Sequence, residues 1–216
     1  MSKKVVAFVP VKLNNQRFQG KNIKEFDNGR PLISYILETL LSTNVLDEIY
    51  VYCSSDSIID YLPEGVKFLK RPESLDQDST LINEVMMSFS KSVDSDVYVL
   101  AHATAPFIKA KSIEKAVKAI THEGYDSSLT VEAKKEFLWL DTNNPHNYDR
   151  KTIPRTQDLA PFYVETTGLY VYKNEVVSNG RRIGENPALI PVDKIESIDI
   201  NEEIDFKIAN AILKVM

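Results

Sequence analysis

The sequence predicts an α/β fold with a mainly parallel sheet, and three consecutive segments carry this prediction. Residues 5–11 form an apolar run that is too short for a helix and rich in β-branched side chains, which is typical of a buried strand. Residues 31–43 carry apolar side chains at helical spacing, and residues 48–54 alternate as a second strand. Strand, helix and strand in this order form a βαβ unit, which implies parallel strands and a right-handed crossover.

Strand and helix patterns continue to alternate along the rest of the chain. Further strands are expected at residues 66–69, 96–101, 127–131, 168–172 and 195–201. Further helices are expected after polar N-cap signals, at Ser55-Asp56, at the end of the loop 70–80, at Ser112 and over residues 202–215. Residues 134–165 break this rhythm, since they show no clear period and contain the only Trp. A long irregular insertion of this kind is usually functional or covers a partner.

Length and composition place the chain among ordinary globular proteins. Its 216 residues suit one domain, which we expect to span residues 1–216. The formal net charge of −5 argues against a general nucleic-acid binder. The single cysteine, Cys53, cannot form an internal disulfide, which favours a reducing compartment. No signal-peptide pattern and no apolar run long enough to span a membrane occur in the sequence, so we expect a cytoplasmic protein.

The loop after the first strand is the strongest candidate for a site. It turns abruptly polar at residue 12 and carries three cations, Lys12, Arg17 and Lys21. Open α/β sheets bind ligands at the carboxyl ends of their strands, so these cations suggest a polyanion, most simply a nucleotide triphosphate. No Gly-x-Gly-x-x-Gly follows the strand, which disfavours a dinucleotide site. The alternative is a solvated basic loop.

Five blocks of residues, in order, resemble a known family. They are Val9-Pro10-Val11-Lys12 through Lys21-Asn22, Arg71-Pro72 with Asp78, Thr104-Ala105-Pro106, Arg155-Thr156-Gln157-Asp158 with Tyr163-Val164-Glu165, and Ile198-Asp199-Ile200. The chain resembles the cytidylyltransferases that activate 2-keto-3-deoxy sugar acids, above all the acylneuraminate (CMP-sialic acid synthetase) group. The likeness spans nearly the whole chain. It is fairly specific for the family and weak for the sugar.

The resemblance implies a fold, a reaction and an assembly. The fold is a Rossmann-like sheet of the GT-A-like nucleotidyltransferase type. The reaction is attack of the anomeric hydroxyl of an acidic sugar on the α-phosphate of CTP, with Mg²⁺ and with release of pyrophosphate. The assembly is a homodimer in which the segment 134–165 reaches the neighbouring subunit. Two alternatives stay open: a nucleotidyltransferase with another acceptor, such as a sugar phosphate or phosphonate, and a nucleotide-binding relative without catalysis.

The resemblance also implies roles for residues of the nucleotide site. Lys12, Arg17 and Lys21 would stabilise the triphosphate, because phosphoryl transfer depends mainly on positioning and charge neutralisation. Amide groups would add hydrogen bonds to the phosphates, from Asn14 and Asn15. Base and ribose would be read by Asn22, Arg71 and Thr80, although Arg71 could equally be an ordinary surface residue. The family usually has Arg at position 12, where this chain has Lys.

Sugar binding is implied for His102, Thr104, Arg155, Gln157, Tyr163 and Glu165. Arg155 would clamp the sugar carboxylate, where bidentate geometry matters. His102 stands where relatives carry Gln, and it could equally be a structural imidazole. Thr166-Thr167-Gly168 replaces the Asn-Gly-Ala common in the sialic-acid enzymes.

Mg²⁺ binding is implied for Asp199 and Asn201, which would lie on the same side of the last expected strand. The family has Asp at both positions, and an amide oxygen in place of the second carboxylate supplies no charge. The alternative is that Asp199 caps the C-terminal helix.

Overall fold

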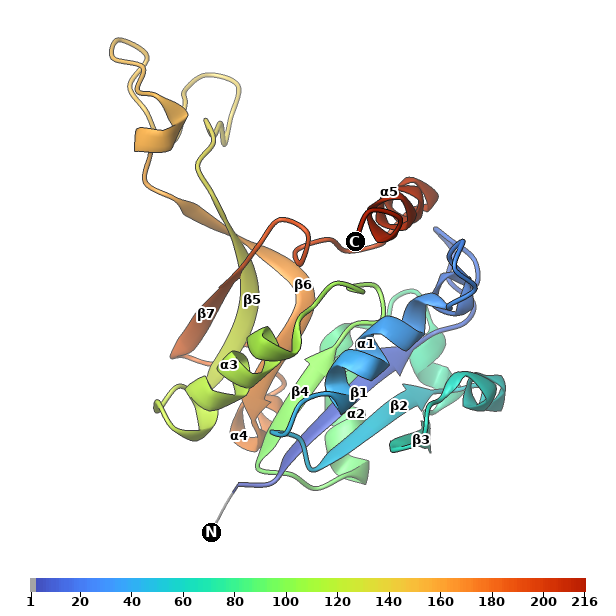
Figure 1. Ribbon diagram of the computed structural model, residues 1–216. Coiled ribbons are helices and arrows are strands. Elements are labelled where there is room, and N and C mark those ends of the chain that lie inside the picture. Colours follow the sequence, from blue (N-terminus) through green and yellow to red (C-terminus); the bar gives the residue numbers. More distant parts are fainter. Residues whose placement is uncertain (1–2) are drawn as a thin grey trace.

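The computed structural model describes residues 3–216 and contains a seven-stranded sheet in the order β3-β2-β1-β4-β6-β5-β7 (Figure 1). The strands are β1 Val5–Val11, β2 Glu48–Cys53, β3 Val66–Lys70, β4 Val97–Ala101, β5 Ser127–Lys134, β6 Phe162–Lys173 and β7 Pro187–Val192. Within the described chain only β6 runs antiparallel to its neighbours β4 and β5. The expected mainly parallel α/β sheet is therefore confirmed.

Helices cover both faces of the sheet (Figure 1). They are α1 Leu32–Leu41, α2 Ile82–Ser92, α3 Ala110–Thr121, α4 Asn174–Ser178 and α5 Glu203–Leu213. Short 3₁₀ turns lie between them, namely η1 Lys21–Ile23, η2 Asp56–Tyr61, η3 Glu73–Asp76 and η4 Thr156–Asp158. One face packs on α1 and α3 and the other on α2 and α4. No helix within residues 3–216 has the length and apolarity needed to cross a bilayer.

Strand β1 lies at the centre of the sheet, which explains its continuous apolar sequence. Its side chains alternate between the two cores: Val9 faces the core formed with α1 and α3, and Phe8 faces the core formed with α2. The Phe8 ring stacks on Phe89 of α2 with 4.2 Å between ring centroids. Because β1 is fixed by strands on both sides and helices on both faces, the loop that leaves its carboxyl end starts from a rigid position.

The prediction of a strand at residues 195–201 is wrong. That segment turns, because the Asp193 carboxylate accepts hydrogen bonds from the backbone N–H groups of Ile195 and Glu196 at 3.0 and 2.9 Å. The seventh strand is β7 instead, at the edge of the sheet beside β5. The sequence did not predict this strand because it contains Pro187 and Pro191. An edge strand tolerates proline because one side of its backbone is unpaired.

Two helix starts also differ from expectation. Helix α2 begins after Leu81, whose backbone N–H donates to the Glu84 carboxylate at 2.7 Å, so the polar residues before it do not act as the N-cap. Helix α3 begins at Ala110, which places Ser112 inside the first turn. In contrast, Ser55 does cap η2, because its hydroxyl accepts a hydrogen bond from the Ser57 N–H.

The irregular segment is an arm that extends from the sheet (Figure 1). Strands β5 and β6 run into it, so regular structure reaches residue 134 and resumes at residue 162, and we call residues 135–161 the arm. Two isolated bridges and η4 give the arm its local order. Several large apolar side chains on it are exposed, among them Phe137, Trp139, Leu140 and Ile153.

Candidate functional site

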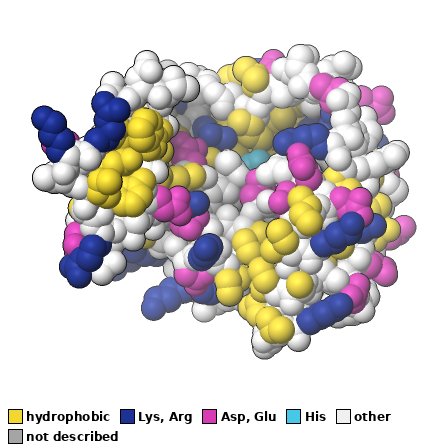
Figure 2. All heavy atoms as spheres, turned by 90° about the horizontal axis from the view of Figure 1, so that it is seen from above, with side chains coloured by type: hydrophobic (Ala, Val, Ile, Leu, Met, Phe, Trp, Pro, Cys, Tyr) yellow, Lys and Arg dark blue, Asp and Glu magenta, His cyan; other side chains and the backbone are white. Residues whose placement is uncertain are grey.

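A cavity of about 460 Å³ opens at the carboxyl ends of β1 and β4, and it gathers most of the predicted site residues. Its lining comes from five separate segments of the chain. The predicted residues in it are Lys12, Asn15, Lys21, Asn22, Arg71, Thr80, His102, Thr104, Asp199 and Asn201. Figure 2 shows the molecule from above, with a hollow bordered by both basic and acidic side chains. The position agrees with the general rule for ligand sites in open α/β sheets.

Lys21 is the most buried of the three loop cations. Its side chain is only 8% exposed, and its Nζ donates a hydrogen bond to the Ile200 carbonyl oxygen at 2.7 Å. Burial lowers the pKa of Lys21, the nearby Asp199 carboxylate opposes that shift, and Arg17 adds to it. One of the three ammonium donors is thus used by the protein, and the others are available to an anion in the cavity.

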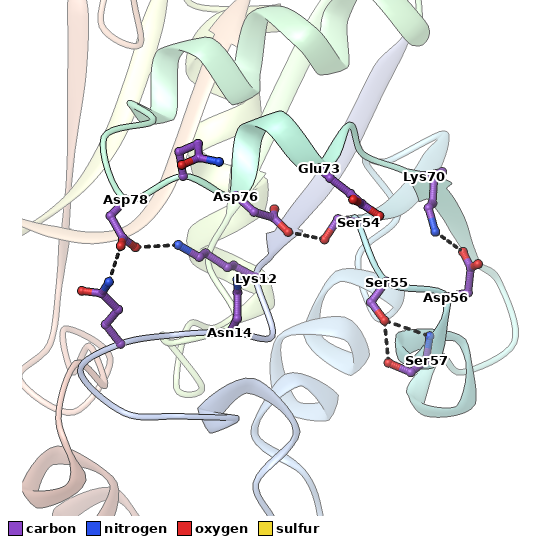
Figure 3. Close-up of a pocket in the computed structure, with 12 residues that line it drawn as sticks. Lys12, Asn14, Ser54, Ser55, Asp56, Ser57, Lys70, Glu73, Asp76 and Asp78 are labelled. Carbon is purple, nitrogen blue, oxygen red and sulfur yellow. Dashed lines mark hydrogen bonds and ion pairs between the residues drawn. The ribbon is translucent and has the colours of Figure 1, made fainter.

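Lys12 pairs with a carboxylate from another loop. Its Nζ lies 2.8 Å from Oδ1 of Asp78, and Gln16 donates to the other oxygen of the same carboxylate. Figure 3 shows the Asp78 carboxylate bonded to Lys12, and both residues line a second, polar cavity of about 720 Å³. Asn14 lines that second cavity, so the structure separates it from Asn15. Arg17 is exposed and outside the residues that line either cavity.

Arg71 is held by a relay of buried polar groups. Its side chain is 4% exposed, so the alternative of an ordinary surface arginine is wrong. The Arg71 guanidinium donates to Asp76, and Asp76 accepts a further hydrogen bond from Ser54. The Nε of Arg71 is buried without a hydrogen-bond partner in the described chain. Sequence reasoning missed Asp76 and Ser54, because η3 brings Asp76 back toward the arginine five residues before it.

Asp199 faces the cavity with one oxygen engaged and one unpaired. Its Oδ2 accepts hydrogen bonds from the Thr167 hydroxyl at 2.9 Å and the Asn201 amide at 2.8 Å. Its Oδ1 is buried and has no hydrogen-bond partner among the described residues. Helix α5 has Glu202 as its N-cap and Asp205 at its first turn, so the alternative role of Asp199 as a helix cap is wrong.

The unpaired Oδ1 of Asp199 indicates whether Mg²⁺ would fit in this cavity. A buried carboxylate oxygen without a donor is costly, and a hard cation prefers oxygen ligands. Asp199 therefore fits the ion, and Asn201, whose amide nitrogen donates to Asp199, can add only its amide oxygen. No three His, Cys, Asp or Glu side chains are grouped to hold a metal within residues 3–216. A cation at Asp199 would therefore take most of its ligands from phosphates and water.

His102 follows β4 directly and lines the same cavity. Burial lowers the pKa of His102 to about 4; Asp199 opposes this shift, while Arg182 and Lys21 add to it. The imidazole is therefore neutral at ordinary pH and offers one donor and one acceptor.

The remaining predicted sugar residues lie outside the cavity. Arg155 is 73% exposed on the arm and pairs with Asp158 at 2.8 and 3.1 Å, and Gln157 is exposed beside it. Tyr163 is exposed at the start of β6. Glu165 accepts a hydrogen bond from the Tyr170 hydroxyl at 2.8 Å. The structure of one chain does not bring these four residues together with the cavity.

Arg182 is a cation that sequence reasoning missed. Its guanidinium lies 3.9 Å from the centroid of the Tyr170 ring and 3.3 Å from Glu165. It follows a short helix in an irregular stretch, and no local motif marks it.

Comparison with known proteins places this geometry in context. Residues 6–187 match the model of a family described as Cytidylyltransferase. The chain is 29% identical over 198 residues to N-acylneuraminate cytidylyltransferase A of Danio rerio, which covers 88% of this chain and 46% of that protein. The chain thus spans about half the length of that relative.

Two further similarities are informative. The chain is 26% identical over 200 residues to 3-deoxy-manno-octulosonate cytidylyltransferase of Christiangramia forsetii, covering 83% of this chain and 77% of that one. A solved structure of CMP:2-keto-3-deoxy-manno-octonic acid synthetase complexed with CTP shares the fold, with a TM-score of 0.72 and 15% identity over 98% of this chain and 99% of that chain.

The buried neutral histidine predicts a pH dependence of stability. The pKa of His102 falls from an ordinary 6.5 to about 4 in the folded chain, so between these values the unfolded chain binds a proton that the folded chain does not. The free energy of unfolding should therefore decrease as the pH falls from 6.5 to 4. His102→Gln should make this decrease shallower in urea titrations.

His122→Gln provides the matched control, because His122 is exposed at the end of α3. It should retain the slope of the parent protein. Equal slopes for the parent and His102→Gln would contradict the assignment.

Proposed function

The chain belongs to the cytidylyltransferase family, and on this premise we propose that it transfers CMP from CTP to a nonulosonic or other 2-keto-3-deoxy sugar acid, releasing pyrophosphate. The observation that carries the proposal is the cavity in which buried Lys21 and Asp199 meet at the carboxyl ends of the strands. The cavity offers cations for a triphosphate and also a carboxylate with an unpaired oxygen. This pairing suits phosphoryl transfer, which needs positioning and charge neutralisation more than covalent help.

Nucleotide binding would begin by exchanging one partner of Lys12. The Lys12–Asp78 pair is partly exposed, and such pairs contribute roughly 0–1 kcal/mol, so a triphosphate can displace the carboxylate at little cost. Arg71, fixed by Asp76, presents its remaining donors toward the nucleotide from a buried position. Asn22 is already bonded to the Lys12 carbonyl oxygen at 3.0 Å and so holds the loop in place for binding.

The chemical step is an in-line displacement. The oxygen of the anomeric hydroxyl forms a bond to the α-phosphorus, the bond from that phosphorus to the bridging β-oxygen breaks, and pyrophosphate leaves with the electron pair. The hydroxyl proton passes to solvent. Lys21 stabilises the charge on the transferring group, and neutral His102 can orient the acceptor through a hydrogen bond. No covalent enzyme intermediate is needed.

Asp199 and Asn201 are the residues that would hold Mg²⁺. When bound, the ion would neutralise phosphate charge and lower the pKa of a coordinated hydroxyl. The residues themselves contribute one negative charge, and a buried oxygen without another partner carries part of it. We place the reaction in the cytoplasm, in keeping with the buried free thiol of Cys53.

A homodimer would complete the binding site for the sugar acid that accepts the CMP group. The arm exposes apolar side chains and also carries Arg155 and Gln157, which the cavity of their own chain does not use. We propose that the arm docks on a second copy of the chain, so that apolar burial drives assembly and Arg155 reaches a sugar carboxylate. Two other functions remain candidates: transfer to a sugar phosphate or phosphonate, and nucleotide binding without transfer.

A substrate panel separates these functions. CTP, UTP, ATP and GTP should be combined in turn with nonulosonic acids, a keto-deoxy octonic acid, sugar phosphates and phosphonates, and pyrophosphate release measured. We expect release with CTP and a keto-deoxy sugar acid. Release only with a phosphorylated acceptor would replace the proposal by the first alternative, and CTP binding without any release would replace it by the second.

Loss of the buried ammonium should reduce turnover. Lys21→Met keeps the apolar stem but removes the charge, and we expect kcat to fall by about 10²–10³-fold, the scale for one preorganised donor. Lys24→Met, which alters an exposed cation just beyond η1, is the matched control and should change kcat by less than about twofold. Near-normal turnover in Lys21→Met would refute the role of Lys21.

Introducing charges on the arm should abolish dimerisation. Leu140 and Ile153 are 68% and 65% exposed, and Leu140→Glu with Ile153→Glu would place two carboxylates in the proposed interface. Light scattering should report a dimer for the parent protein and a monomer for this variant. Ile59→Glu, at an exposed position on η2, serves as the control and should remain dimeric. A monomeric parent protein at micromolar concentration would contradict the proposal.

A further inference from the structure

Thr167 has a strained backbone beside the site. Its φ is 58°, and it is the only residue other than glycine with a positive φ in the part of the chain that the structure describes. A β-branched residue is a genuine outlier in this left-handed region, because its side chain crowds the backbone there. Strained residues of this kind persist where the surrounding structure determines them, and they cluster at functional sites.

Both neighbours of Thr167 are fixed by packing. The hydroxyl of Thr166 is buried and lies 2.6 Å from the hydroxyl of Thr130 on β5. Gly168 approaches the loop after β4 so closely that a Cβ added to it would lie 2.8 Å from the Cβ of Ala105. The chain therefore has little freedom to relieve the strain by shifting on either side of Thr167.

An irregular strand pairing directs Thr167 toward the cavity. Strand β6 pairs Tyr170 with Leu129 of β5, but the next partners are Glu165 and Val131. Residues 166–169 thus lie opposite the single residue Thr130, so this bulge is larger than the usual two residues opposite one. Bulges re-aim side chains and are frequent next to active sites. Here the result is that Thr167 lines the same cavity as Asp199.

The Thr167 hydroxyl contacts the candidate metal ligand. It lies 2.9 Å from Oδ2 of Asp199 and 2.7 Å from the carbonyl oxygen of Thr166, so one proton serves two acceptors. Asn201 donates to the same Oδ2 at 2.8 Å. Two donors therefore converge on one oxygen of the carboxylate, and the other oxygen, Oδ1, stays without a donor. This asymmetry fixes the rotation of the carboxylate about its χ2 angle.

We propose that Thr167 is a positioning residue, which holds the Asp199 carboxylate so that its free oxygen is presented to a divalent cation bound with the nucleotide. The backbone strain is retained because it brings the Thr167 hydroxyl within hydrogen-bond distance of Asp199. The inference deepens the proposed function and rests on it for the identity of the nucleotide. The alternative is that the bulge alone imposes the conformation and the hydroxyl is incidental.

Three substitutions separate these readings. Thr167→Val keeps the branched shape and the strain but removes the hydroxyl. Thr167→Gly removes the hydroxyl and also the strain, so it is compatible with the backbone even if the valine variant folds poorly. Thr167→Ser keeps the hydroxyl. Thr121→Val makes the Thr-to-Val change on α3, outside the residues that line the site cavity, and serves as the control.

The primary readout is the affinity of the chain for Mn²⁺ in the presence of CTP and without acceptor, measured by electron paramagnetic resonance. No turnover is possible under these conditions. Thr167→Val and Thr167→Gly should weaken Mn²⁺ binding by about tenfold or more, the scale for losing an outer-shell partner. Thr167→Ser and Thr121→Val should stay within about twofold of the parent. The glycine variant should also melt at or above the temperature of the parent.

A double-mutant cycle tests whether Thr167 acts through Asp199. In the background Asp199→Asn, the further change Thr167→Val should cause no additional loss of Mn²⁺ affinity, because the group that it positions is gone. Additive losses would overturn the inference, as would parent-like Mn²⁺ affinity in both Thr167→Val and Thr167→Gly.

Failure of the proposed function gives a different pattern. A parent protein that binds Mn²⁺ and CTP but releases no pyrophosphate in the substrate panel would refute the transfer reaction, while the Mn²⁺ titrations would still decide the role of Thr167. A parent protein with no Mn²⁺ site in the presence of CTP would overturn the inference.

Discussion

The hydrogen bond from the Lys21 ammonium to the Ile200 carbonyl joins two parts of the chain that are 179 residues apart, and the site depends on it. A buried charge is expensive unless it is compensated. Ile200 and the nearby Asp199 compensate this one only in part, since burial still lowers the pKa of Lys21. An anion in the cavity would complete the compensation, so in the proposed function the contact that joins these two segments would also prepare the site for phosphate.

The two lysines that line the cavity would therefore have different roles in the proposed function. Lys21 is buried and donates a hydrogen bond to a backbone carbonyl oxygen. Lys12 is partly exposed and pairs with the Asp78 carboxylate, which lies on a different loop, between η3 and α2. A fixed cation gives the transition state a preorganised donor. In the proposed function, an exchangeable cation would let the triphosphate enter without first breaking a strong interaction. The two carboxylates thus differ in their roles. Asp78 holds Lys12 in a pair that a ligand could replace, whereas Asp76 fixes the orientation of the Arg71 guanidinium.

Periodicity predicted the elements that are buried on both sides, and it failed where local hydrogen bonds decide the chain path. The first strand and the helix over residues 32–41 follow their apolar patterns closely. Ile195, Ile198 and Ile200 imitate a strand, but the Asp193 carboxylate turns the chain there. In the site, the rule that ligands bind at the carboxyl ends of the strands correctly predicted which loops line the cavity. The position of Thr167 could not be foreseen, because it depends on a bulge whose register is set by the partner strand.

The residues proposed to bind the nucleotide lie together within one chain, whereas most of those proposed to bind the acceptor do not. Lys12, Lys21 and Arg71 all reach one cavity from segments anchored on the sheet. Two further arginines lie outside the cavity lining: Arg182 is paired with Glu165, and Arg155 is exposed on the arm, where we propose that it binds the acceptor. In the proposed function, nucleotide recognition would therefore reside in the core of the fold, and acceptor recognition in its most exposed extension. Such an extension can change without disturbing the core, which explains why the resemblance identifies the nucleotide chemistry more sharply than the sugar.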